Sequence, residues 1–360
     1  FYTLFSYFYF LFSFFRPRER IFSLTFTHVC PIIILLNIFT NKEVVMDFLL
    51  QGFQALADNP KMIAMWLIGG ILIYLAIKKD MEPALLLPMG FGAILVNLPL
   101  SPVIEEHGII NSLFQVGIAA SEAMPLLLFI GIGCMIDFGP LLTNPKLFIL
   151  GGAAQLGIFV TIILAAMIGF PLNDAASIGI IGAADGPTAI LVAIQLASKY
   201  VGPIMVVAYS YMALVPIVQP AVIKMCTTKK ERRIKMKYNA KQIPKLMRIL
   251  FPIIVTIVSG IIAPDSLSLV GMLMFGNLLR ECGVLQSLSE TAQTTFANII
   301  TLLLGITIAF QMQAEAFLSL ETIIIMALGL FAFVFDTVGG VMCAKLINLF
   351  SKEKIADVGV

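Results

Sequence analysis

The sequence predicts an all-α polytopic membrane protein, arranged as a transporter-like bundle of inverted repeats with interrupted helices. Hydrophobic residues make up 59% of the 360-residue chain and charged residues only 12%, too few charges to cover the surface of a soluble domain. Apolar stretches long enough to cross a bilayer recur along the chain. Several apolar segments also contain glycine and proline, which indicates breaks within helices.

Eight stretches approach or exceed the roughly 20 apolar residues that a helical span needs. They are 62–78, 124–142, 146–171, 175–197, 202–224, 247–263, 296–313 and 321–350. Two other apolar segments, 83–98 and 264–282, carry glycine, proline or asparagine inside. We expect these to be half-helices or re-entrant pieces, which occur at membrane depth only where protein or a water-filled cavity surrounds them.

The orientation in the membrane follows from lysine and arginine. Segment 224–248 holds ten basic residues against one glutamate, so the positive-inside rule predicts a basic cytoplasmic loop. This loop is either a solvated charge run or also a docking surface for a soluble partner. The 99–123 connection carries no lysine or arginine and is predicted to lie outside.

Segments 83–98 and 264–282 also resemble each other. Each begins at a proline, places a glycine seven residues further on and approaches an asparagine (Asn97 and Asn277), at an offset of about 180 residues. This pattern predicts a first transmembrane repeat at 46–223 and a second at 249–360. Secondary transporters built on such repeats bind ligands near the midplane, at interrupted helices.

Both ends of the sequence depart from this plan. The first methionine is Met46, and Lys42-Glu43-Val44 can be encoded by a purine-rich ribosome-binding sequence. We therefore expect 1–45 to be non-native upstream translation, with a leader segment as the alternative. The repeat offset, added to Asp185, lies beyond Val360, so we expect the second repeat to be truncated.

The segment 182–188, Gly-Ala-Ala-Asp-Gly-Pro-Thr, is expected to interrupt the 175–197 span. Its glycines permit unusual backbone angles, and its proline lacks an amide donor and disfavours helix in the preceding residue. A carboxylate at membrane depth, here Asp185, normally faces a cavity or pathway. With exposed carbonyls such as that of Gly182 and the hydroxyl of Thr188, it forms an all-oxygen set suited to Na⁺. A structural cap or a proton relay are the alternatives.

Other polar groups in apolar surroundings are weaker candidates. Tyr209, Ser210 and Tyr211 lie in the next span, and the two tyrosines cannot both face one cavity. Asp137 is expected to mark a helix end, whereas Asp336 is a lone acid within an apolar span. Interhelical hydrogen bonding accounts for Asn277 and Asn298.

These motifs resemble a known family. MGFGAILVNLP, GIGCMIDFGPLLTNPK, IGIIGAADGPTAI, AYSYMALVP, VGMLMFGNLLRECGV and GGVMCAKLINLFSK, in this order from about Met46 to Ile355, are similar to the beta subunit of sodium-pumping biotin-dependent decarboxylases. The resemblance implies a bacterial inner-membrane subunit that decarboxylates carboxybiotin, exports Na⁺ and consumes a proton. The family's essential aspartate corresponds to Asp185, and its functional tyrosine to Tyr211.

The resemblance also implies partners. The biotin cofactor is carried on a separate biotin carrier subunit, an alpha subunit performs carboxyl transfer, and a small gamma or delta subunit joins in the membrane. We further expect a homo-oligomer and no nucleic acid. After Ile355 the family continues with an NPLIGAAGVSA-like interrupted helix, whereas this sequence does not, so the resemblance places half of the ion site in that segment. A Na⁺-coupled secondary transporter of a small carboxylate is the alternative function.

Overall fold

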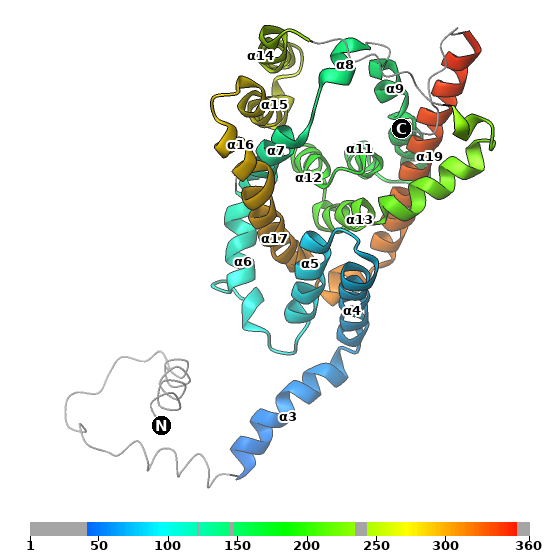
Figure 1. Ribbon diagram of the computed structural model, residues 1–360. Helices are drawn as coiled ribbons and strands as arrows, with labels where there is room; N and C mark the ends of the chain where they lie inside the picture. The colour runs from blue at the N-terminus through cyan, green and yellow to red at the C-terminus, as the bar shows by residue number, and fades with distance from the viewer. Residues whose placement is uncertain (1–41, 121, 145–146, 235–242, 351–360) are drawn as a thin grey trace. The chain divides into compact units, whose positions relative to one another are not determined.

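A computed structural model describes residues 42–120, 122–144, 147–234 and 243–350. The chain separates into two compact units, with the boundary between Gln54 and Ala55. The first described helix, α3, is Lys42–Asp58. All further helices belong to the second unit, whose described residues are predominantly helical (Figure 1).

The first half of this unit contains the interrupted segment. Its helices are α4 (Lys61–Lys79), α5 (Pro83–Val96), η1 (Pro102–Ile104), α6 (Ile109–Phe114) with a π-helical turn at Gln115–Ala119, α7 (Ala123–Met135), α8 (Gly139–Thr143), α9 (Leu147–Ala153), α10 (Leu156–Ile168), α11 (Leu172–Gly179), the 3₁₀ turn η3 (Ile180–Ala183), α12 (Gly186–Gln195) and α13 (Val201–Cys226). The segments α11, η3 and α12 together occupy the predicted 175–197 span.

The second half follows the basic segment, in which η4 is Glu231–Arg233. Its helices are α14 (Lys245–Ile262), η5 (Pro264–Ser266), α15 (Leu267–Cys282), α16 (Gln286–Thr291) with a π-helical turn at Ala292–Phe296, α17 (Ala297–Ile308), η7 (Ala309–Gln311), α18 (Ala314–Phe317) and α19 (Leu320–Phe350).

Among the described residues, five helical segments are long and apolar enough to cross a membrane, and up to seven if two bent pairs each count as one span. α14 shows the exposure expected of such a span, because large apolar side chains along it, including Ile257, Ile261 and Ile262, remain exposed. In a bilayer these side chains face lipid, which costs nothing in hydrophobic free energy. The chain is therefore a polytopic membrane protein, as its composition predicted.

One predicted span was wrong, and two other segments contain helices. The span 124–142 is not continuous, because α7 ends at Met135 and Asp137 accepts a hydrogen bond from the Gly139 amide (2.8 Å) where the helix resumes. The 99–123 connection contains α6 and a π-helical turn. Segment 264–282 holds the unbroken helix α15, since single glycines are tolerated within transmembrane helices.

Two asparagines tie the halves of the unit together in equivalent ways. The Asn97 side chain, just after α5, donates to the Met312 carbonyl and accepts from the Ala314 amide, both at 2.7 Å. The Asn277 side chain, on α15, donates to the Ile136 carbonyl at 2.9 Å. Each asparagine side chain thus forms hydrogen bonds with the backbone of the other half of the unit. Two symmetry-related repeats would produce such reciprocal contacts.

The interrupted segment lies within a packed group of helices. η3 and α11 pack against α10 and α19, and α12 packs against α13 (Figure 1). The buried apolar side chains of this group form one cluster that includes Ile178, Ile181, Val207 and Leu328. The backbone break is therefore held by surrounding protein, the condition under which irregular backbone is tolerated at membrane depth.

Candidate ion-binding site

The interruption centres on two residues. Ala184 adopts the left-handed conformation (φ 52°) and Asp185 an extended one (φ −125°). α12 then begins at Gly186 with Pro187 in its first turn, where a missing amide hydrogen costs no helical bond. Asp185 consequently occupies the N-cap position of α12, at the positive end of the helix dipole.

The side chain of Asp185 is paired with Thr188. The Thr188 hydroxyl donates a hydrogen bond to Asp185 Oδ2, and both residues are partly exposed. A hydroxyl that donates its hydrogen keeps its lone pairs available, and the carboxylate keeps its second oxygen. Together they present oxygens alone, the donor type that hard cations prefer.

Tyr209 is the tyrosine beside this break. Its side chain is fully buried on α13, and its ring lies against Gly186. A Cβ atom at position 186 would fall 2.5–2.7 Å from three carbons of the ring, so any larger residue requires the ring or the backbone to move. The Tyr209 hydroxyl is buried and has no hydrogen-bond partner among the described residues.

Tyr211 faces a different helix. Its hydroxyl donates a hydrogen bond to the Met326 carbonyl of α19, and its ring lies against Gly329. The two tyrosines therefore have different surroundings, as predicted: Tyr209 lies against Gly186 and Tyr211 against Gly329. Ser210, between them, is half-buried.

The other predicted candidates differ in their placement. Asn277 is buried and bonds the end of α7 through the Gly133 and Ile136 carbonyls, so its predicted role in interhelical bonding is confirmed. Asn298 is exposed on α17. Gly182 is buried at the end of η3, where it faces α19.

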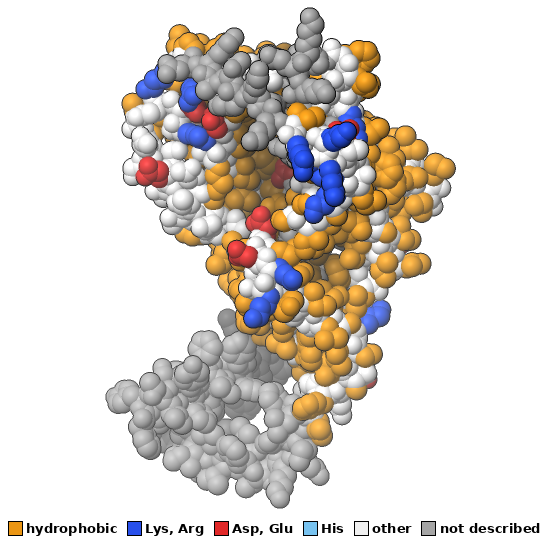
Figure 2. All heavy atoms as spheres, turned by 45° about the vertical axis from the view of Figure 1, so that its right-hand side comes forward, with side chains coloured by type: hydrophobic (Ala, Val, Ile, Leu, Met, Phe, Trp, Pro, Cys, Tyr) orange, Lys and Arg blue, Asp and Glu red, His pale blue; other side chains and the backbone are white. Residues whose placement is uncertain are grey.

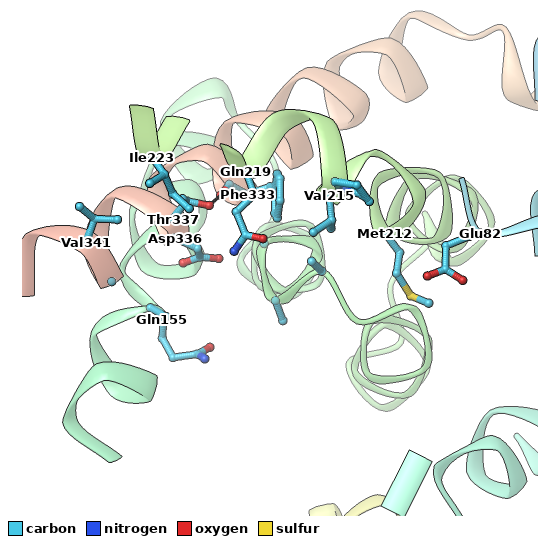
Figure 3. Close-up of a pocket in the computed structure, with 16 residues that line it drawn as sticks. Glu82, Gln155, Met212, Val215, Gln219, Ile223, Phe333, Asp336, Thr337 and Val341 are labelled. Carbon is cyan, nitrogen blue, oxygen red and sulfur yellow. Dashed lines mark hydrogen bonds between the residues drawn. The ribbon is translucent and has the colours of Figure 1, made fainter. Parts of the chain in front are cut away.

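A cavity of about 450 Å³ lies beside the break. Its wall includes residues 182–184 of the interrupted segment, one face of α13 and the acid Asp336 of α19 (Figure 3). α13 bends by 67° between its parts Val201–Met212 and Leu214–Cys226. Pro216 and Pro220 explain this bend, because a proline within a helix removes a backbone hydrogen bond and clashes with the preceding turn.

The proximity of Asp336 to the interrupted segment could not be predicted from the sequence. Asp336 is 154 positions away from Gly182 in the chain, yet its Oδ2 atom lies against Gly182 so closely that a Cβ there would clash. The only available signal was that an acid within an apolar span normally faces a partner or cavity.

The cavity lining extends along α13 to Ile223, near the point where the basic segment begins. The Lys345 ammonium of α19 forms an ion pair with Glu231 at 3.2 Å, which joins the end of α19 to the segment after α13. Figure 2 shows a group of Lys and Arg side chains beside a hollow in an otherwise largely apolar face, with an acidic side chain recessed in the hollow.

Comparison with known proteins shows the family of the chain. The family model described as the Na⁺-transporting oxaloacetate decarboxylase beta subunit matches residues 61–358. The methylmalonyl-CoA decarboxylase subunit beta of Propionigenium modestum is 46% identical over 342 residues, covering 87% of this chain and 85% of the relative. The glutaconyl-CoA decarboxylase subunit beta of Acidaminococcus fermentans is 46% identical over 284 residues (79% and 75%).

A third relative has a lower sequence identity. The probable oxaloacetate decarboxylase beta chain of Vibrio cholerae is 40% identical over 353 residues, covering 81% of each chain. These identities and the match to most of the chain establish its family. The polytopic helical protein described above, with Asp185 at the break between η3 and α12, belongs to the beta subunits of Na⁺-transporting decarboxylases.

Proposed function

We propose that this chain is the membrane subunit of a Na⁺ pump, in which decarboxylation of carboxybiotin drives Na⁺ export. The observation that carries the proposal is the carboxylate of Asp185 at the N-terminus of α12, paired with Thr188 in a break enclosed by helices. Family membership supports the pump over a Na⁺-coupled transporter of a small carboxylate.

The chemistry requires a proton and a site that can hold either proton or Na⁺. In carboxybiotin the bond between the ureido nitrogen and the carboxyl carbon breaks, CO₂ leaves, and the nitrogen takes up one proton. Asp185, with Thr188 and nearby carbonyl oxygens, would bind Na⁺ as a carboxylate and release it on protonation. The proton then passes to the biotin nitrogen, so that proton consumption and Na⁺ release are coupled.

The two tyrosines have separate proposed roles. Tyr209 presents a buried, unpartnered hydroxyl beside Gly186, so it is the group placed to donate a hydrogen bond or proton near Asp185. Tyr211 ties α13 to the Met326 carbonyl and acts as a positioning residue. The biotin carrier, the carboxyltransferase alpha subunit and a small gamma or delta subunit are the proposed partners in the bacterial cytoplasmic membrane.

The test is decarboxylation by the purified complex of the full chain with its partner subunits. We expect Na⁺-stimulated activity that avidin abolishes and that Asp185→Asn reduces to background. Asp137→Asn is the matched control, because Asp137 caps α8 and lies outside the proposed site. Activity that persists with avidin, or that Asp185→Asn leaves intact, contradicts the proposal.

A further inference from the structure

The turn that follows α13 carries more positive charge than its own folding uses. Residues 224–234 contain five lysines and arginines but a single acid, Glu231. Figure 2 shows a group of Lys and Arg side chains bordered by apolar surface. A run of cations is often merely solvated, so the partner of each charge shows which cations remain available to a ligand.

The acid of this turn is committed to the fold. Glu231 Oε2 accepts a hydrogen bond from the Thr228 amide at 2.6 Å, and the Thr228 hydroxyl accepts one from the Glu231 amide at 3.4 Å. This reciprocal pairing is a capping box. Glu231 Oε1 lies 3.2 Å from Lys345 Nζ of α19. Glu231 therefore shapes the turn and attaches it to α19.

Arg232 is also used by the fold. Its guanidinium donates hydrogen bonds to the Thr227 carbonyl at 2.6 Å, the Thr227 hydroxyl at 3.2 Å and the Lys224 carbonyl at 3.3 Å. Carbonyl groups at the end of a helix lack partners within that helix. Arg232 thus satisfies the C-terminal end of α13 and fixes the turn from a second side.

Three cations of the turn remain without such a role. Lys229, Lys230 and Arg233 are exposed, and none of them forms an ion pair with a residue that the structure describes. Lys224 is exposed as well, but it lies in the last turn of α13, where the helix dipole favours a positive charge. Three like charges on a fixed turn repel one another, and a bound anion would relieve that repulsion.

The surface beside these cations is apolar. α13 and α19 pack against each other, and the ion pair of Glu231 with Lys345 holds the turn against the end of α19. Near these two helix ends Met225 is 86% exposed and Leu349 78% exposed. α19 is long and apolar enough to cross a membrane. A ligand with a negative head and apolar chains can contact both surfaces, whereas a soluble acidic protein matches only the cations.

We propose that Lys229, Lys230 and Arg233 bind the phosphate group of an anionic phospholipid, whose acyl chains lie along the ends of α13 and α19. The positive-inside rule places this turn at the cytoplasmic leaflet, where anionic lipids attract basic residues next to a membrane span. A bound lipid would then hold the ends of both helices in one place. This site does not depend on the pump function, because it contains neither Asp185 nor a partner subunit.

Lipid binding to the purified full-length chain in an uncharged detergent tests the site. The probe is fluorescent phosphatidylglycerol, followed by anisotropy and displaced by unlabelled phosphatidylglycerol or phosphatidylcholine. We expect phosphatidylglycerol to compete better. Lys229→Gln with Lys230→Gln should weaken its binding by about twenty-five-fold, because each basic residue contributes roughly fivefold. Equal competition by the two lipids, or unchanged affinity in this double variant when folded, overturns the proposal.

Lys78→Gln with Lys79→Gln is the matched control. These two lysines are also exposed in the last turn of a helix, α4, but Asp80 and Glu82 follow them directly. Their loss should leave phosphatidylglycerol binding unchanged, and a loss as large as that in the first double variant overturns the assigned site.

Two further measurements keep the test decisive. Arg233→Gln alone should weaken phosphatidylglycerol binding by about fivefold, and unchanged affinity in that variant overturns the proposal even if the double variant does not fold. A soluble poly-glutamate peptide represents an acidic protein partner. If the peptide binds through Lys229 and Lys230 while phosphatidylglycerol competes no better than phosphatidylcholine, the surface belongs to a protein and the lipid site is wrong.

Discussion

The contact between Gly186 and Tyr209 gives the sharpest prediction about the interrupted helix. In Gly186→Ala, the new methyl carbon would lie 2.5–2.7 Å from three ring carbons, whereas carbon atoms pack best at roughly 3.5–4.0 Å. The ring is fully buried, so the backbone of the break must move by about 1 Å. Overpacking of this kind costs about 1–3 kcal/mol.

The cost should appear in stability and in Na⁺ binding. If the displaced break is the one that binds Na⁺, a loss of this size weakens binding by about fivefold to about a hundredfold, since each 1.4 kcal/mol is tenfold. Denaturant unfolding of the detergent-solubilised protein, with and without Na⁺, measures both effects. Tyr209→Leu in the same protein should restore part of the lost free energy of unfolding, because it vacates the space that the methyl group needs.

Gly151→Ala is the matched control for this experiment. Gly151 lies on α9, where an added Cβ atom would meet none of the described residues within 4 Å. Alanine there should therefore be neutral or stabilise the helix by about 0.5–1 kcal/mol. If Gly186→Ala is as stable as Gly151→Ala, or if Tyr209→Leu brings no recovery, the close contact is not what shapes the break.

Three further outcomes are expected. Tyr211→Phe removes one interhelical hydrogen bond and should lower the free energy of unfolding, measured in denaturant, by about 0.5–1.5 kcal/mol. Asn277→Ala removes two bonds to the end of α7 and should cost about 1–3 kcal/mol in the same assay, whereas Asn298→Ala, at an exposed position, should be neutral. Hydrogen bonds from Thr228 and the nearby Lys345 lower the pKa of Glu231 from 4.5 to about 2. Because the folded pKa is the lower one, Glu231 stabilises the fold fully above about pH 4.5 and loses this contribution as the pH falls toward 2; acid titration of unfolding should show this slope, and Glu231→Gln should lack it.

The sequence predicted the helices and breaks that depend on residues close together in the chain. Long apolar stretches identified spans such as α4 and α19, because bilayer thickness sets the length of a spanning helix. The break at Asp185 was also predictable, since glycine and proline act on their own backbone. Segment 264–282, predicted to be a half-helix or re-entrant piece, forms the 16-residue helix α15 after a short 3₁₀ turn, and α7 and α14 pack against it.

The arrangement of the site depends instead on contacts between residues that are far apart in the sequence. Helical spacing showed that Tyr209 and Tyr211 could not both face one cavity, but only the structure showed that the Tyr209 ring packs on Gly186. The approach of Asp336 to Gly182 brings together residues from α19 and η3. A single sequence carries no information about such a pairing, so Asp336 remained a lone acid until the structure placed it.

In the proposed mechanism Asp185 couples decarboxylation to Na⁺ movement. The most direct measurement of this coupling is ²²Na⁺ transport in proteoliposomes that contain the full chain and its partner subunits, started by the acyl substrate. We predict transport that avidin abolishes, that Asp185→Asn eliminates and that Asp137→Asn retains. Substrate-driven ²²Na⁺ transport at an undiminished rate in Asp185→Asn would contradict this role of Asp185.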